Sequence, residues 1–419
     1  MPSDGGGRRA ALTILFLVNV LNIYDRQVLG AILEPLRREF HLSDTQLGAL
    51  PAAFTVVYAL AGLPLGRLAD RWSRKRLLAL GVTVWGSLTG LSALASSYVL
   101  LFASRMGVGI GEAVCAPAAT SWIGDVVPPE RRARSLAGFM TAVPVGVMLS
   151  FVISGPVAQA WGWRTALGIA ALPALVLVPA LLALGEPART GAKSAQGDAR
   201  ALLRIRPLWW IAASGAIVNF VLYSFSTFIA ALLSRYHGLS VAQAGVWAGI
   251  GSGVAGMAGA AAAGAFGDRT PEAGGRLRLA AAAAALAVLP AAAGTALPAG
   301  MPALAIPLLM LAYGLLQTYY GLVYAAIQDL VEPSLRATAM AAYYLAMYLA
   351  GGALGPLLTG RLSDWFAARA SAMGLAAEAA RASGLQQAMF VVPVLAALLA
   401  AALWRAARAA ANPPAPPYF

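Results

Sequence analysis

The chain has 419 residues, of which 60% are hydrophobic and 11% are charged, and its formal net charge is +13. Soluble domains contain about 25% charged residues, so this composition excludes a soluble protein and a nucleic-acid-binding role for the positive charge. The single cysteine, Cys115, excludes a disulfide framework and a cysteine-based metal site, and the two histidines, His41 and His237, fall near expected loops. We therefore expect an integral membrane protein without a bound metal.

Twelve apolar segments are long enough to cross a bilayer, since about 20 helical residues span a hydrocarbon core about 30 Å thick. Their expected limits are 10–32, 44–69, 76–97, 99–124, 133–159, 164–184, 207–235, 241–266, 276–297, 301–328, 337–362 and 385–407. The first of them lacks a following cleavage site and is expected to be a spanning helix rather than a signal peptide. Ser43-Asp-Thr-Gln46 has the spacing of a capping box and should begin the second helix.

The polar stretch 185–206 separates the sixth apolar segment from the seventh. We therefore predict an all-α membrane protein with an N-terminal six-helix bundle (1–184), a cytoplasmic linker (185–206) and a C-terminal six-helix bundle (207–419).

The distribution of basic residues predicts the orientation, because cytoplasmic loops are enriched in Lys and Arg. With the N-terminus inside, seven of the 30 basic residues fall outside: Arg37, Arg38, Arg164, Arg235, Arg361, Arg369 and Arg381. Arg26 and Arg105 fall within the membrane, and the other 21 fall on the cytoplasmic side. Both termini are therefore expected in the cytoplasm.

An internal repeat divides the chain into two similar halves. The loop Gly66–Arg71 (GRLADR) returns 198 residues later as Gly264–Arg269 (GAFGDR). The pair Gly155-Pro156 returns as Gly355-Pro356 after 200 residues, and we expect both pairs to allow close packing and bending between the halves. A membrane protein built from two similar halves is typically a transporter.

These loops and glycine–proline pairs resemble the major facilitator superfamily over essentially the whole chain. In that family the acidic residue of the loop pairs with helix ends and loop arginines when the inner side is closed. The resemblance therefore implies that Asp70 and Asp268 are gate residues, with Arg71 and Arg269 beside them. The alternative is that the basic residues of this loop only fix the topology.

Two further stretches resemble the Spinster branch of that superfamily: Asn22–Arg26 (NIYDR) and Arg105–Ala113 (RMGVGIGEA). Eukaryotic members of this branch export sphingosine phosphate or lysophospholipids, often linked to protons. The short tails and the abundance of Arg and Ala are typical of a bacterial member, which implies a multi-pass location in the inner cell membrane.

Four charged residues are expected inside the membrane: Asp25, Arg26, Arg105 and Glu112. A charge there costs several kcal/mol unless it is paired or wet. Arg105 and Glu112 are seven residues apart and lie on nearly one helix face, whereas Asp25 and Arg26 diverge by about 100°. We expect Asp25 and Glu112 to exchange protons, and Arg26 and Arg105 to bind an anionic headgroup. A static ion-pair network that orients the N-terminal bundle is the alternative.

The C-terminal half offers neutral polar and aromatic groups in the membrane instead of charges. Asn219 and Tyr223 share one helix face, as do Tyr320 and Tyr324, because each pair is four residues apart. We expect these four, with Tyr24, to contact the substrate, although packing or an interfacial aromatic belt would explain the tyrosines equally well. A cavity charged on one side and aromatic on the other suits an amphiphile.

The sequence therefore predicts a monomeric, proton-coupled secondary transporter that moves a lysolipid- or sphingolipid-like anionic amphiphile by alternating access. Its expected partners are this substrate, protons and the lipid bilayer, and no nucleic acid. The alternatives are a proton-linked symporter of small organic anions, a drug exporter of the same superfamily, and a membrane receptor that transports nothing. The sequence contains no Gly-x-x-x-x-Gly-Lys-Ser/Thr phosphate loop and no catalytic constellation, so we expect neither a cofactor nor an enzyme.

Overall fold

The computed structural model describes residues 5–186, 202–203, 205–332 and 335–411, and within these ranges the chain is almost entirely helical. The helices before residue 186 are α1 (Gly5–Phe40), α2 (Asp44–Arg71), α3 (Arg74–Ala93), α4 (Tyr98–Glu112), α5 (Cys115–Val126), α6 (Pro129–Met140), α7 (Ala142–Trp161), α8 (Trp163–Ala171) and α9 (Pro173–Ala183). Those after residue 205 are α10 (Arg206–Arg235), α11 (Val241–Asp268), α12 (Ala273–Ala296), α13 (Pro302–Leu330), α14 (Arg336–Ala346), the π-helix η2 (Met347–Ala353), α15 (Leu354–Ala372), α16 (Ala377–Ala388) and α17 (Val391–Ala411).

Eleven helical stretches in these ranges are long and apolar enough to cross a membrane. They correspond to eleven of the twelve predicted segments, and the remaining prediction, 76–97, corresponds to α3. That helix has 20 residues, enough to span the hydrocarbon core, and begins with three basic residues that lower its mean hydropathy. The twelve-helix membrane fold predicted from the sequence is confirmed, and the chain is a multi-pass membrane protein.

The second helix begins at the capping box that the sequence predicts. Ser43 Oγ accepts a hydrogen bond from the Gln46 N–H at 3.2 Å, and Gln46 Oε1 accepts one from the Ser43 N–H at 2.9 Å. The same arrangement starts α11, where Ser240 and Gln243 exchange bonds of 3.2 and 3.1 Å. Each box satisfies two amides that the helix itself leaves unpaired, so the second helix of each half starts in the same way.

Several spans are interrupted where the sequence analysis expects a continuous segment. The segment 133–159 is divided at Thr141 into α6 and α7, and 164–184 is divided at Leu172 into α8 and α9. Pro173 begins α9, and its missing N–H cannot continue the hydrogen-bond ladder of α8. The eleventh span contains η2, and π-helical turns frequently mark functional sites.

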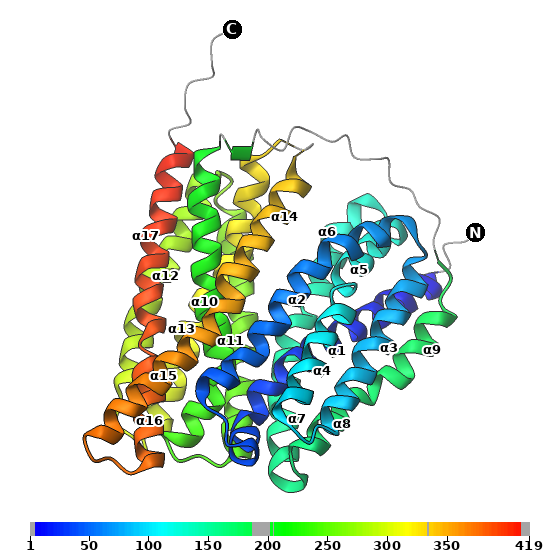
Figure 1. Cartoon of the computed structure of the whole chain (residues 1–419). Coiled ribbons are helices and arrows are strands. Elements are labelled where there is room, and N and C mark those ends of the chain that lie inside the picture. The colour runs from blue at the N-terminus through cyan, green and yellow to red at the C-terminus, as the bar shows by residue number, and fades with distance from the viewer. Residues whose placement is uncertain (1–4, 187–201, 204, 333–334, 412–419) are drawn as a thin grey trace.

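The helices form two bundles, α1–α9 and α10–α17, which lie side by side in Figure 1. The start of α1 and the end of α17 lie toward the same end of the molecule, which we call the terminal end; the opposite end is the distal end. The bundles converge at the distal end and diverge toward the terminal end (Figure 1). Most of the predicted linker, residues 187–201 and 204, lies outside the described residues, so the domain limits stay a prediction.

Glycines let the two bundles approach closely near the distal end. A Cβ atom on Gly48 of α2 would lie 2.1 Å from the carbonyl oxygen of Pro356, and one on Gly360 of α15 would lie 2.1 Å from that of Asp44. Gly155 of α7 packs against Gly245 of α11 in the same manner, with its Cβ position 3.0 Å from the Gly245 Cα. Backbones can meet at such distances only where a side chain is absent, so these contacts define a tight interface between the bundles.

Candidate functional site

The first buried ion pair joins α1 to α4 inside the N-terminal bundle. Arg105 Nη1 donates to Asp25 Oδ1 at 3.0 Å, and Arg105 Nη2 donates to the Asp25 carbonyl oxygen at 2.8 Å. Thr89 of α3 donates its hydroxyl to the second carboxylate oxygen. Both charged side chains are 1% exposed. All the acceptors of Asp25 therefore have donors, and the pair ties three helices together.

The second buried ion pair joins the same two helices, one residue further along α1 and seven residues further along α4. Arg26 donates from Nε and Nη2 to the same oxygen of Glu112, Oε2, at 3.3 and 3.2 Å, and from Nη2 to Asn22 Oδ1 at 3.3 Å. Glu112 is completely buried, and neither its Oε1 nor Asn22 Nδ2 has a hydrogen-bond partner among the described residues. A buried carboxylate oxygen without a donor is costly, so this atom offers a place for a proton.

The two pairs have the geometry that helical spacing predicts. Asp25 and Arg26 diverge and bind different partners, whereas Arg105 and Glu112 both face α1 from one side of α4. The structure therefore brings together the four charges expected in the membrane. Which of them exchange protons or bind an anion stays a prediction.

Arg26 also contacts aromatic rings at the boundary between the bundles. Its guanidinium carbon lies 4.4 Å from the ring centroid of Tyr58 and 5.2 Å from that of Phe54. The Tyr58 ring meets Tyr348 of the C-terminal bundle at 5.6 Å, and Tyr348 meets Tyr223 at 6.4 Å. Residues of both bundles line a cavity here: Arg26, Gln27, Leu29, Gly30, Pro51, Phe54, Thr55, Arg105, Tyr223, Ser226 and Thr227. This cavity is the candidate functional site.

Tyrosines extend from this cavity into the C-terminal bundle. Tyr324 packs against Tyr320 at 5.6 Å and against Tyr344 at 5.5 Å, and Tyr344 in turn stacks on Tyr348 at 6.3 Å. The rings belong to α13, α14 and η2 and form a continuous wall. Of the predicted substrate contacts, Tyr223 lines the cavity directly, and Tyr320 and Tyr324 connect to it through this wall.

Asn219 of α10 points toward the π-helix η2. Its Nδ2 donates to the Gly215 carbonyl at 3.3 Å, while its buried Oδ1 has no hydrogen-bond partner among the described residues. A Cβ on Gly351 of η2 would lie 2.3 Å from the Ala216 carbonyl oxygen and 2.8 Å from Asn219 Cβ. The Asn219 side chain, which we expect to contact the substrate, is therefore buried against η2, and its Oδ1 has no donor among the described residues.

Tyr24 does not reach the cavity. Its hydroxyl lies 2.8 Å from Ser154 Oγ of α7, and the side chain is 8% exposed. Because Tyr24 and Arg26 are two residues apart on one helix, their side chains point to nearly opposite sides of α1. Tyr24 joins two helices of the N-terminal bundle, and this geometry does not support the expected substrate contact.

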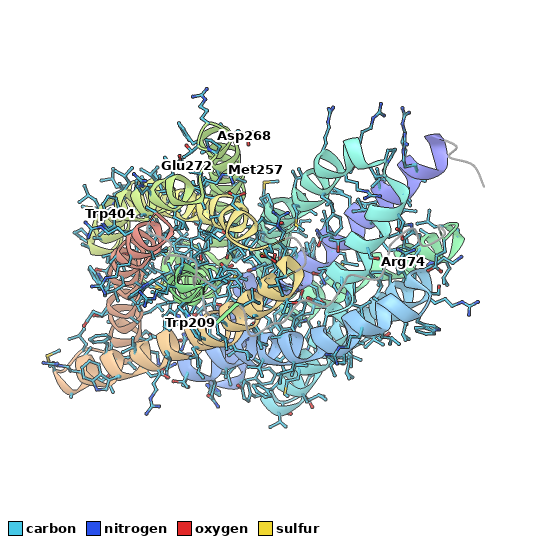
Figure 2. The ribbon with its side chains drawn as sticks, turned by 90° about the horizontal axis from the view of Figure 1, so that it is seen from above. Arg74, Trp209, Met257, Asp268, Glu272 and Trp404 are labelled. Carbon is cyan, nitrogen blue, oxygen red and sulfur yellow. The ribbon has the colours of Figure 1, made fainter. Side chains whose placement is uncertain are left out.

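The predicted gate residues lie at the terminal ends of α2 and α11. The side chains of Asp70 and Arg71 lie outside the described part of the structure. Asp268 and Arg269 are exposed, and Figure 2 shows Asp268 on the bundle opposite Arg74 when the molecule is seen from the terminal end. No pairing of Asp268 or Arg269 is described, so their gating role stays a prediction.

Two ion pairs near these loops were missed from the sequence. Arg74, at the start of α3, pairs with Asp125 of α5, and Arg276, in the first turn of α12, pairs with Asp329 of α13. The two pairs occupy equivalent places in the halves, so a full alignment of the repeat would have found them. Each anchors the first turn of the third helix of its half.

Comparisons with known proteins agree with this architecture. The Major Facilitator Superfamily profile matches residues 15–356. An MFS-type efflux pump of Mycolicibacterium smegmatis is 35% identical over 368 residues, which cover 86% of each chain. The sphingosine-1-phosphate transporter SPNS2 of Danio rerio is 31% identical over 241 residues, or 54% of this chain and 47% of that protein.

A solved structure is similar over almost the whole chain. It is a bacterial homologue of the human lysosomal transporter Spinster in an inward-facing and occupied conformation, with a TM-score of 0.86, 26% identity and coverage of 96% and 97% of the two chains. The fold, the repeat and these matches agree, and the chain belongs to the major facilitator superfamily of transporters as a Spinster-like member.

Proposed function

We propose that this transporter moves an anionic amphiphile of the lysolipid or sphingolipid class together with protons, and that Glu112 carries the proton. The observation that carries the proposal is the Arg26–Glu112 pair at the cavity, in which no described residue donates to the buried Glu112 Oε1. Asp25 is the weaker candidate, because Arg105 and Thr89 already satisfy both of its carboxylate oxygens.

Charge balance links the proton to the cargo. Asp25, Arg26, Arg105 and Glu112 sum to zero, so an anion entering this dry site adds an uncompensated negative charge. An anionic headgroup would take Arg26 away from Glu112, and the unpaired carboxylate would then bind a proton. Anion and proton therefore favour each other's binding, which couples their movement in one direction.

The opposite wall of the site suits an apolar chain. Tyr223 lines the cavity, and Tyr348 and Tyr344 continue from it through contacting rings. Aromatic faces bind apolar chains at little cost in side-chain entropy. We place the headgroup at Arg26 and the chain along these tyrosines. The excess of basic residues at the terminal end supports a cytoplasmic location for that end.

The test measures flux in proteoliposomes with a fluorescent lysophospholipid outside and a pH-sensitive dye inside. The wild type should accumulate lipid only when a proton gradient is imposed, and the dye should report acidification as lipid enters. Glu112→Gln should still bind the lipid but lose the response to the gradient. Glu39→Gln is the matched control, because Glu39 pairs with Arg164 at the surface, far along α1 from the cavity.

Equal gradient-driven flux in Glu112→Gln and the wild type would contradict proton transfer at Glu112.

The second candidate is export of a drug-like cation in exchange for protons, which the similarity to an efflux pump favours. A cation would compete with the proton instead of accompanying it. Exchange would therefore carry protons opposite to the cargo, and the dye would report the reverse pH change.

A further inference from the structure

An exposed group of arginines and tryptophans lies at the terminal end of the C-terminal bundle. The Arg405 guanidinium carbon of α17 lies 5.2 Å from the ring centroid of Trp210 of α10, and that of Arg408 lies 5.6 Å from the ring centroid of Trp404. Trp210 is 38% exposed, Trp404 is 47% exposed, and both arginines are exposed. We name these four residues, together with Trp209, the Arg–Trp patch. None of the five belongs to the described lining of the cavity.

Two neighbouring helices form the patch. α10 packs against α17, and Figure 1 shows their terminal ends side by side. Arg405 joins the two, because it belongs to α17 and lies over a ring of α10. Trp209 is 58% exposed, and its Nε1 donates to the Leu203 carbonyl oxygen at 3.1 Å, which orients the ring. Figure 2 shows Trp209 and Trp404 on this bundle, seen from the terminal end. The patch therefore has a fixed position on two packed helices.

The exposed face of α17 changes from apolar to cationic along the helix. Val394 and Leu398 are exposed, and Arg405 follows Leu398 by seven residues, which keeps it on the same face. At about 1.5 Å per residue, Arg405 lies about 10 Å from Leu398 along the axis, and Arg408 lies about 15 Å from it. Trp404 lies between the apolar and the cationic part, as tryptophans do at a membrane interface. Apolar surface, aromatic rings and cations thus follow in the order of the chains, glycerol and phosphate of a phospholipid.

The cations of the patch are available to an anion. Neither Arg405 nor Arg408 forms an ion pair within the described part of the chain, although both are ordered over tryptophan rings. A ring covers one face of a guanidinium and leaves the N–H groups at its edge free to donate. Those groups match a phosphate, which they bind through two parallel hydrogen bonds.

The equivalent place in the N-terminal bundle has the opposite charge. The sequence of α9, which ends the sixth span, contains neither arginine nor tryptophan. Glu186 follows it, and its carboxylate accepts from the Arg74 N–H at 2.6 Å at the start of α3. The fold therefore does not require an Arg–Trp patch at the end of a bundle, and we look for its role in binding.

We infer that the Arg–Trp patch binds an anionic phospholipid of the surrounding bilayer, with the phosphate at the two arginines, the glycerol region at the tryptophans and the acyl chains along the apolar face of α17. Lipid covers the exposed face of a spanning helix, so a bilayer lipid reaches this surface before any soluble anion does. A headgroup with net negative charge, such as phosphatidylglycerol, is attracted by both arginines, whereas phosphatidylcholine carries its own cation beside the phosphate. This inference concerns a lipid outside the cavity, so it does not depend on the proposed cargo or on Glu112.

The test measures quenching of tryptophan fluorescence by brominated lipids in nanodiscs of phosphatidylcholine. One sample contains a small share of dibrominated phosphatidylglycerol, and the other contains the same share of dibrominated phosphatidylcholine. Bromine quenches rings that it contacts, so stronger quenching by phosphatidylglycerol reports its enrichment beside tryptophans. The wild type should show this excess. Replacing Trp209, Trp210 and Trp404 together by Phe should remove it, because the other tryptophans lie outside the patch.

Arg405→Gln combined with Arg408→Gln should lower the enrichment of phosphatidylglycerol by about fivefold for each arginine, the factor that one basic side chain contributes near an anionic membrane surface. This variant keeps every tryptophan. The matched control is Arg131→Gln combined with Arg134→Gln, an exposed pair with the same spacing on α6, also toward the terminal end (Figure 1). The control should keep the excess quenching of the wild type.

Equal quenching of the wild type by the two lipids would overturn the inference. So would an unchanged excess in the variant of Arg405 and Arg408, or an equal loss in the control. A larger excess for brominated single-chain lysophosphatidylglycerol than for phosphatidylglycerol would also overturn it, because the occupant would then be a lysolipid and not a bilayer lipid.

Discussion

In the N-terminal bundle, Arg26 and Arg105 line the cavity and pair with the buried Glu112 and Asp25. On the side of the C-terminal bundle, Tyr223 lines the cavity and Tyr348 packs against it. The charged side is held in place by hydrogen bonds between helices, from Arg26 of α1 to Glu112 and from Arg105 of α4 to Asp25. The aromatic wall relies on ring contacts with centroids 5.5–6.4 Å apart, each of which is weaker than a charge-assisted hydrogen bond. One half is therefore built to hold a charge in place, and the other can accommodate chains of different shape.

The halves are alike where the fold itself needs a feature. Both start their second helix with a capping box, at Ser43 and at Ser240, and both anchor their third helix with an arginine–aspartate pair. The features that differ lie at the cavity. Structural requirements thus repeat with the fold, while the chemistry of transport is divided between the halves.

Of the variants that test this difference between the bundles, Asp25→Ala should change the free energy of unfolding most. It leaves Arg105 buried without its carboxylate, and removal of one partner of a buried pair costs about 3–5 kcal/mol. The free energy of unfolding in detergent should fall by that amount. Adding Arg105→Leu should recover most of the loss, because the double variant buries no unpaired charge. A single variant as stable as the wild type would show that the pair does not stabilise the bundle.

A smaller effect is expected on the aromatic wall from Tyr324→Leu. The ring contacts Tyr320, Tyr343 and Tyr344, and each aromatic pair contributes about 0.5–1.5 kcal/mol, part of which leucine replaces. We expect stability to fall by about 1 kcal/mol and binding of a long-chain lysophospholipid to weaken about fivefold.

Binding of a short-chain analogue with the same headgroup should not change in Tyr324→Leu. The matched control is Tyr24→Leu, which alters a tyrosine that lies outside the cavity lining. Equal weakening for short and long chains would contradict the division between headgroup and chain.

Much of this architecture follows from the sequence alone. Hydropathy finds the twelve segments because the bilayer fixes their length, and the four central charges stand out because charge is rare in the membrane. Helical spacing then separates the partners of Asp25 and Arg26 correctly. Each of these predictions uses only local spacing and the cost of burial.

The remaining features depend on contacts between distant segments. Arg235 sits at the end of a helix, where loop counting assigns it to water, and only the packing of α10 against the end of α1 and the first turn of α2 buries it. Asp364 resembles any loop carboxylate until the first turn of α2 reaches it from the other bundle. The π-helix lies where Gly351 approaches the backbone of Ala216, a contact between distant segments that the local sequence does not show. The direction of Tyr24 toward Ser154 depends on how α1 is rotated in the bundle, which local spacing does not fix.

The smallest expected effect is a pH dependence of stability that distinguishes two equivalent loop positions, one in each half. His41 follows α1 and is exposed, whereas His237 follows α10, is 5% exposed and packs its ring on Tyr236 at 5.1 Å. Burial lowers the pKa of His237 below its ordinary value of 6.5, and its Nδ1 has no hydrogen-bond partner among the described residues. The unfolded chain therefore binds this proton at a higher pH than the folded protein does.

It follows that the free energy of unfolding should decrease as the pH falls below about 6.5, and should not depend on His237 above about pH 7.5. The decrease should stay below about 1 kcal/mol, because His237 lies in a turn at the end of α10, where nearby solvent screens the charge. Denaturant unfolding between pH 7.5 and 5 measures it. His237→Gln should flatten that profile, whereas His41→Asn, a residue that tolerates the positive φ of 52° at this position, should leave it unchanged. Equal flattening in both variants would place the pH response outside the buried histidine and remove this difference between the halves.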